Sequence, residues 1–309
     1  MGHLLRRKGV QVEGEIGSVK RFLGVAMANL EQPDLVREAH EDYLKAGARV
    51  ITTNSYSCVP RIVGGDEAFI LQVIQAAGEV ARKAADQYGA MVAGCLPPLG
   101  ASYRPDDVGT EEELEREYAR IAAAIAPYSD ILLCETMSCV REAVVAARAA
   151  VATGKPVWVS WTLAEDLSGN LVSGESVAEA VRALPLPSSG EASSEEPHGG
   201  VKALLFNCSL PECVSAALPK LSAVLPPGIA CGAYANSFHT VMSPGGGNKE
   251  YRDNLSPSDY AKFCKDWAAE GATIVGGCCG IFPEHIAMVA QEAAMAPSGR
   301  DSSPSSGQQ

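Results

Sequence analysis

Short runs of apolar and β-branched residues alternate along the chain with longer segments whose apolar positions recur every three to four residues. The short runs predict seven buried strands, at residues 49–56, 91–97, 131–137, 157–163, 203–209, 229–236 and 273–280. The longer segments predict eight helices, at residues 33–46, 66–88, 110–126, 138–152, 175–183, 211–223, 256–269 and 283–294. This alternation is typical of an α/β protein with a parallel sheet and right-handed crossovers.

The strand count is one short of a closed barrel, which needs eight strands. Residues 3–7 have the pattern of a short helix, so the absent strand is the one expected before them. We therefore predict an α/β fold, a (β/α)8 TIM barrel that lacks its first strand. The alternative is an open, doubly wound sheet, which the absence of a G-x-G-x-x-G turn after the early strands disfavours.

Composition divides the chain further. Residues 184–200 (LPLPSSGEASSEEPHGG) are rich in Pro, Ser, Glu and Gly, and the end of the chain has the same character. We predict one barrel domain over residues 1–295, with a disordered insertion at 184–200 and a disordered tail at 296–309. Residues 243–248 (SPGGGN) predict a flexible loop.

Charge and hydropathy limit the partners. The chain has 25 Lys and Arg against 37 Asp and Glu, a net charge of −12, with no basic cluster. We therefore expect small-molecule substrates, and neither nucleic acid nor membrane as a partner. The N-terminus lacks the apolar run of a signal peptide, which predicts a cytoplasmic protein. The ten cysteines of the chain would be reduced in the cytoplasm, where clustered cysteines indicate metal binding or catalysis.

Two adjacent cysteines flanked by glycines, in GGCCG at residues 276–280, end the last predicted strand. Alone, Cys278 and Cys279 are also compatible with one packed and one incidental cysteine, or with a strained vicinal disulfide. Cys208 ends another strand, and a barrel collects the carboxyl ends of its strands on one face. Three thiolates without a fourth protein ligand select zinc and leave one position open, as in a catalytic site.

A zinc ion with three thiolates has a net charge of −1 and is a weak activator of water. It is well suited to binding a substrate thiol as a thiolate that stays nucleophilic at neutral pH. The implied reaction is alkyl transfer to a thiol. A sulfonium donor suits it, because the leaving group departs as a neutral thioether.

Four motifs in order, AGARVITTNSY at 46–56, ETM at 135–137, FNC at 206–208 and GGCCG at 276–280, resemble homocysteine S-methyltransferases. The resemblance extends over about residues 4–290. It implies a (β/α)8 barrel that binds zinc through three cysteines and makes methionine from homocysteine. The cobalamin-independent members of the family use S-methylmethionine, S-adenosylmethionine or betaine as the methyl donor.

Carried over residue by residue, the resemblance makes Cys208, Cys278 and Cys279 the zinc ligands and the catalytic residues. Glu135 matches the strand-end carboxylate that holds the amino group of homocysteine. The residues that match the rest of the substrate pocket are Thr52, Thr53, Asn54 and Asn236. Structural roles stay open for some of them: Glu135 as a helix cap, and residues 52–54 as partners of the loop backbone.

The chain departs from the family at two places. Ala235 stands before Asn236, where the family usually has Pro. The Asp-Gly-Gly type turn that ends the family's first strand, and whose Asp helps to bind the substrate amine, has no match at Met1 to Leu5.

Three functions are therefore compatible with the sequence. The first is zinc-dependent methyl transfer from S-methylmethionine or S-adenosylmethionine to homocysteine. The second is a relative that uses betaine or methylates selenocysteine or another thiol, and the third is a zinc-binding barrel that is inactive because the N-terminal strand is absent.

Overall fold

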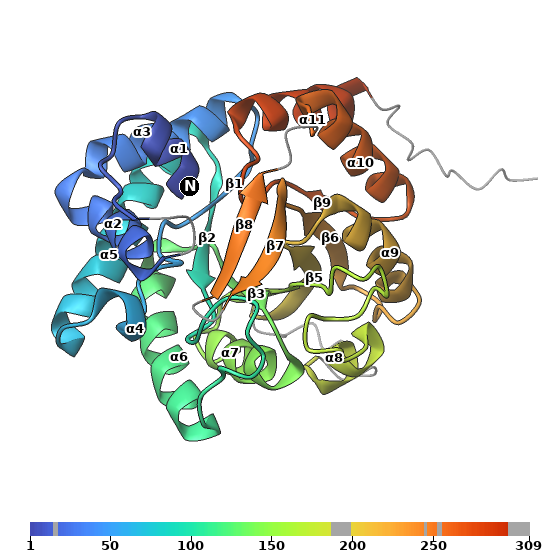
Figure 1. Cartoon of the computed structure of the whole chain (residues 1–309), viewed down its shortest axis with the longest axis horizontal. Helices are drawn as coiled ribbons and strands as arrows, with labels where there is room; N and C mark the ends of the chain where they lie inside the picture. The colour runs from blue at the N-terminus through green and yellow to red at the C-terminus, as the bar shows by residue number, and fades with distance from the viewer. Residues whose placement is uncertain (15–17, 187–198, 244–245, 252–254, 296–309) are drawn as a thin grey trace, which may run out of the picture.

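The computed structural model describes residues 1–14, 18–186, 199–243, 246–251 and 255–295. Within them, seven parallel strands form one curled sheet whose spatial order follows the order along the chain (Figure 1). The strands are β1 (Val50–Thr52), β2 (Met91–Leu96), β3 (Ile131–Met137), β4 (Pro156–Trp161), β5 (Gly200–Asn207), β6 (Ala230–Tyr234) and β9 (Ile274–Val275). All seven strands expected from the apolar runs are present, and the sequential order is that of a barrel rather than of a doubly wound sheet.

Helices pack on the outside of the sheet (Figure 1). They are α1 (Gly2–Arg7), α2 (Val19–Glu31), α3 (Pro33–Lys45), α4 (Pro60–Val63), α5 (Glu67–Tyr88), α6 (Glu111–Ile125), the 3₁₀ turn η1 (Ala126–Tyr128), α7 (Val140–Val151), α8 (Val177–Ala183), α9 (Pro211–Ser222), α10 (Pro257–Ala269) and α11 (Pro283–Met295). The eight expected helices are confirmed to within two residues at each end. None of the helices in the described ranges is long and apolar enough to cross a membrane.

Helix α2 was not expected from the sequence. Ser18 caps it by accepting a hydrogen bond from the backbone N–H of Arg21, and α2 packs against α3, α4 and α5. Gly24 in its middle lies against Val12, where the backbone of residues 8–14 passes the helix. Glycine weakens helix propensity, so this helix depends on tertiary packing that the local pattern does not reveal.

The sheet has an open edge between β1 and β9, and the expectation of a barrel without its first strand is confirmed over the part of the chain that the structure describes. The N-terminal residues do not enter the sheet. Leu5 in α1, together with Val10 and Val12 in the segment that follows, forms a separate apolar cluster with Val36 of α3 and Phe282. Residues 10–12 are therefore irregular chain that packs against helices, α1 and α3 among them.

The expectation of a flexible loop at residues 243–248 is wrong in its described part. Strands β7 (Phe238–Ser243) and β8 (Gly246–Tyr251) form an antiparallel pair, while residues 244–245 lie outside the described residues. Figure 1 shows this pair, in orange, as a ribbon apart from the barrel sheet. Glycine-rich chain suits a hairpin as well as a loop, and pairing between the two strands is not visible in local composition.

Most of the predicted insertion, residues 187–198, and the predicted tail, residues 296–309, lie outside the described residues. The described ends of the insertion join α8 to β5. Leu184 follows α8 and is buried in the main core, and Gly200 is the first residue of β5.

His40 in α3 supplies a stability prediction, because its imidazole is buried and its Nε2 has no hydrogen-bond partner within the described residues. Burial lowers the pKa of His40 from 6.5 to about 3. Below pH 6.5 the unfolded chain binds a proton that the folded chain does not, so stability falls as pH falls. Between pH 6.5 and 5 this loss is roughly 2 kcal/mol.

As pH falls from 7 to 5, the free energy of unfolding of His40→Leu should decrease less than that of the parent. Urea unfolding at pH 7, 6 and 5 measures both. The difference between the two proteins removes the contributions of other titrating groups. Parallel pH profiles for parent and variant would contradict the prediction.

Candidate metal centre

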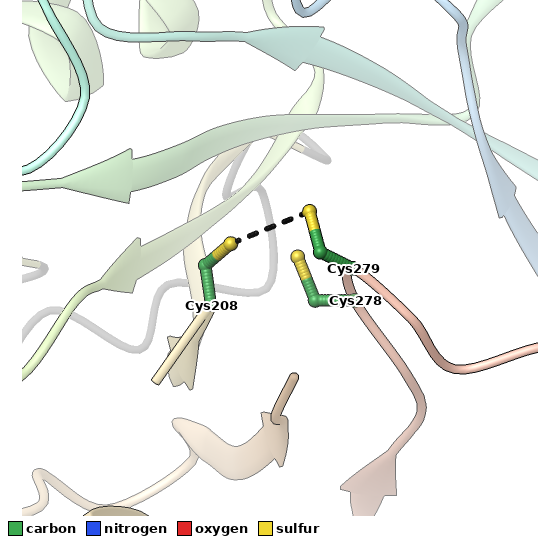
Figure 2. A group of neighbouring side chains, drawn as sticks. All are labelled: Cys208, Cys278 and Cys279. Carbon is green, nitrogen blue, oxygen red and sulfur yellow. Dashed lines mark hydrogen bonds between the residues drawn. The ribbon is translucent and has the colours of Figure 1, made fainter. Parts of the chain in front are cut away.

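Three cysteine sulfurs meet at the carboxyl ends of the strands. Cys208 directly follows β5, while Cys278 and Cys279 lie in the loop that follows β9. Their Sγ atoms all lie within 4.8 Å of one another, and the Sγ atoms of Cys208 and Cys279 are 3.8 Å apart. Figure 2 shows the three side chains pointing toward one another from two separate segments. The structure thus brings together the thiols that strand topology had placed on one face.

The backbone explains how adjacent cysteines reach one point. Strand β9 ends at Val275, and the chain then turns, with the N–H of Cys278 donating to the carbonyl of Ala235 at 2.9 Å. A side chain at Gly277 would meet Cβ of Ile281 at 2.6 Å, so only glycine fits there. Cys208 has a left-handed backbone with φ of 51°, which non-glycine residues seldom adopt. Such strain is concentrated at functional sites.

The sulfur positions suit a tetrahedral metal ion. Zn–S bonds of about 2.3 Å place the sulfurs about 3.8 Å apart, the separation of Cys208 and Cys279. Without a cation the cluster disfavours ionisation. Hydrogen bonds with Cys208 and Cys279, and then burial, raise the pKa of the Cys278 thiol well above its ordinary value. A bound cation would reverse this preference, because it stabilises thiolates and releases their protons.

Two polar side chains that the sequence did not single out contact the sulfurs. The hydroxyl of Tyr103, in the loop between β2 and α6, lies 2.9 Å from Sγ of Cys208 and 3.2 Å from its carbonyl oxygen. Nδ2 of Asn207 lies 3.9 Å from Sγ of Cys278. The FNC motif could have indicated Asn207 as a site residue. Tyr103 is 105 residues from Cys208 in the sequence, and no motif around it indicates a contact with the site.

Asn207 also joins β5 to β3. Its Oδ1 accepts from the backbone N–H of Thr136 at 3.0 Å and from the hydroxyl of Ser160 at 2.8 Å, and its Nδ2 donates to Oγ1 of Thr136 at 2.7 Å. Thr136 has a φ of 60°, so the carboxamide holds a strained backbone directly after Glu135. The thiol cluster and the end of β3 are therefore linked through one buried side chain.

Glu135 is buried at the end of β3 and forms no ion pair within the described residues. Its Oε2 lies 3.3 Å from Sγ of Cys95, which donates to it. Burial raises the pKa of the Glu135 carboxyl above 4.5. Glu135 does not cap α7, because the N-cap residue of that helix is Cys139. The positive charge at the N-terminus of the chain acts to lower the pKa of Glu135, and burial outweighs it.

The residues after β1 are held by the protein itself. Oγ1 of Thr53 accepts from the backbone N–H of Cys95 at 3.0 Å and shares a hydrogen bond with the hydroxyl of Ser55. Nδ2 of Asn54 donates to Oδ1 of Asn29 in α2 at 3.0 Å. Thr52 is the last residue of β1 and is partly exposed. Thr53 thus bonds to the protein backbone and Asn54 to helix α2, as expected if these residues have a structural role.

Asn236 is fully buried between β6 and β7. Its Oδ1 accepts from the backbone N–H of Phe238 at 3.2 Å, and its own N–H donates to the carbonyl of Ser209 at 3.0 Å. Its Nδ2 is buried without a hydrogen-bond partner in the described part of the chain. Ser209 follows Cys208, so Asn236 lies against the segment that carries one of the three thiols.

A parallel barrel-type sheet that gathers three thiols and a buried carboxylate at the carboxyl ends of its strands has the donor set of a metal centre. The chain belongs to the homocysteine S-methyltransferase family, whose model matches residues 1–293. It is by family a methyltransferase.

Known relatives agree with this assignment. Homocysteine S-methyltransferase of Escherichia coli K12 is 31% identical over 290 residues, covering 84% of each chain. Betaine–homocysteine S-methyltransferase 1 of Mus musculus is 27% identical, covering 90% of this chain and 69% of the mouse protein. The metallated crystal structure of the homocysteine methyltransferase MmuM from Escherichia coli superposes with a TM-score of 0.75 at 27% identity, covering 94% of this chain and 93% of MmuM.

Proposed function

We propose that this protein transfers a methyl group from S-methylmethionine or S-adenosylmethionine to the thiolate of L-homocysteine, forming methionine. The observation that carries the proposal is the group of three Sγ atoms within 4.8 Å of one another at the carboxyl ends of the strands. The metallated state of MmuM adds support, since that enzyme is similar over nearly its whole length.

We further propose that Cys208, Cys278 and Cys279 hold zinc. When bound, zinc keeps the sulfur of the substrate in its thiolate form at neutral pH. The protein supplies the three thiolate ligands, and Asn207 orients the strand end beside them.

Glu135 binds the ammonium group of homocysteine in this proposal. Its carboxyl is buried and forms no ion pair within the described residues, so a substrate ammonium would give it an opposite charge in direct contact. Thr52, Thr53, Asn54 and Asn236 border the same end of the sheet and complete the proposed pocket. Their protein contacts fix its walls, and the buried Nδ2 of Asn236 is a donor available to a ligand.

Methionine formation tests the proposal. The zinc-loaded protein is incubated with homocysteine and, separately, S-methylmethionine, S-adenosylmethionine and betaine, and methionine is measured by mass spectrometry. We expect turnover with one of the two sulfonium donors and a much lower rate with betaine. Turnover with betaine alone, or faster methylation of selenocysteine than of homocysteine, would favour the related activities. Zinc binding without methylation of any of these thiols would favour an inactive zinc-binding barrel.

A further inference from the structure

The loop between β2 and α6 reaches across the carboxyl ends of the strands and brings a phenol hydroxyl to one of the three sulfurs. Tyr103, near the middle of the loop, is 3% exposed and has a left-handed backbone with φ of 63°. Its hydroxyl lies 2.9 Å from Sγ of Cys208, a short contact for a sulfur acceptor. A buried tyrosine in a strained backbone conformation must be held there by its surroundings.

The rest of the loop supplies that support. Oδ2 of Asp107 accepts from the backbone N–H of Ala101 at 3.0 Å and from Arg61 at 2.7 Å. The hydroxyl of Tyr56 pairs with that of Ser102 at 2.7 Å, one residue before Tyr103. The loop is thus closed on itself and tied to the segment after β1, which leaves Tyr103 little freedom to move away from Cys208.

The proposed reaction creates a problem of selectivity, and the inference rests on that proposed function. Homocysteine would add a fourth thiolate to a site that already contains three, and a methyl sulfonium can alkylate any of them. Methylation of a cysteine ligand would destroy the site. A hydrogen bond donated to a thiolate ties up part of its lone-pair density, and so lowers its reactivity toward an electrophile while leaving it able to bind a metal.

We propose that Tyr103 is the positioning residue that protects Cys208 from alkylation, by donating its hydroxyl hydrogen to the Cys208 sulfur. The reaction it suppresses is simple. The lone pair of the Cys208 thiolate attacks the methyl carbon, a new S–CH3 bond forms, the bond from carbon to the leaving group breaks, and the leaving group takes that electron pair. Cys208 becomes S-methylcysteine, a neutral thioether and a poor metal ligand.

Methyl iodide without homocysteine tests the proposal, since this probe needs no methyltransferase activity. Zinc-loaded parent and Tyr103→Phe proteins are treated with it, and the methylated cysteines are located by peptide mass spectrometry. We expect Cys208 to be methylated about tenfold faster or more in the variant, because a hydrogen bond to a charged group is lost. The rates at Cys278 and Cys279 in the same sample serve as internal references. Transfer of zinc to a chelator should also become about 10- to 100-fold more favourable.

Tyr56→Phe is the matched control, because it removes the phenol hydroxyl that pairs with Ser102 in the same loop and leaves the hydroxyl of Tyr103 in place. It should raise the methylation rate of Cys208 far less than Tyr103→Phe does, because Asp107 still ties the loop to Ala101 and Arg61. Melting curves establish that each variant is folded, and Tyr103→Met, which fills the space without a donor, replaces Tyr103→Phe if that variant unfolds. An unchanged rate at Cys208 in the Tyr103 variant would overturn the proposal. So would an equal increase in Tyr56→Phe, which would assign the protection to loop closure. Neither result depends on whether methionine is formed.

Discussion

Replacing Cys208 by alanine should reduce the zinc content from about one ion per chain to less than about a tenth of that, because one of three ligands is lost from the site. Methionine formation should fall by at least about a hundredfold. Loss of a residue that only hydrogen-bonds to a metal ligand already costs up to about a hundredfold, and loss of the ligand itself should cost more. The Sγ of Cys208 lies at the end of β5 and not inside the helical packing, so the fold should persist. Elemental analysis, circular dichroism and the methionine assay measure the three effects.

Cys213→Ala is the matched control. Cys213 lies five residues further on in α9, is fully buried, and is not part of the thiol cluster. It should cost some stability through the small cavity, while zinc content stays at the parent value. Stoichiometric zinc in the Cys208→Ala protein would remove Cys208 from the proposed ligands.

Replacing Glu135 by glutamine should lower kcat/KM for homocysteine by about 10- to 150-fold, the cost of losing a hydrogen bond of about 1.5–3 kcal/mol to a charged group. Glutamine keeps the shape of the side chain and removes its charge. Zinc content should not change, because Glu135 is not among the three thiol ligands. If the variant has the same kcat/KM as the parent, Glu135 does not bind the substrate ammonium.

The pH dependence gives Glu135 a second signature. Burial raises the pKa of its carboxyl above 4.5, and only the ionised form attracts an ammonium group. Substrate affinity should therefore fall as pH falls toward that raised pKa, at a higher pH than for a solvated glutamate. Glu135→Gln should lack this acid limb. Glu142 is also a buried carboxyl, but it accepts hydrogen bonds from the hydroxyl of Tyr118 and the backbone N–H of Leu99. Glu142→Gln should therefore lower the melting temperature and keep the acid limb of the substrate-affinity profile.

Most of the fold was predictable because its determinants are local. Apolar runs such as residues 131–137 coincide with β3, and the helical pattern of residues 110–126 coincides with α6. Helix α2 was missed because Gly24 and mixed polarity weaken its local signal, while its stability comes from α3 and α5. The β7–β8 pair was missed because a glycine-rich segment does not reveal which strand it will pair with.

The thiol cluster was also predictable, for a topological reason. In a parallel barrel every strand ends on the same face, so Cys208 and the pair Cys278 and Cys279 were expected on one face once the strands were assigned. The turn after β9 and the left-handed backbone of Cys208 then bring their Sγ atoms to within 4.8 Å of one another. The sequence by itself thus determined the strand order and the face on which the three sulfurs lie.

Only the tertiary structure decided what surrounds those sulfurs. The hydroxyl of Tyr103 reaches Cys208 across 105 residues, and Asn207 connects Cys278 to the strained backbone after Glu135. It also decided that Asn54 is bonded to α2. These contacts depend on the path of a loop, on side-chain rotamers and on left-handed backbone conformations. All three are set by packing between distant segments, which residue order and local propensity do not encode.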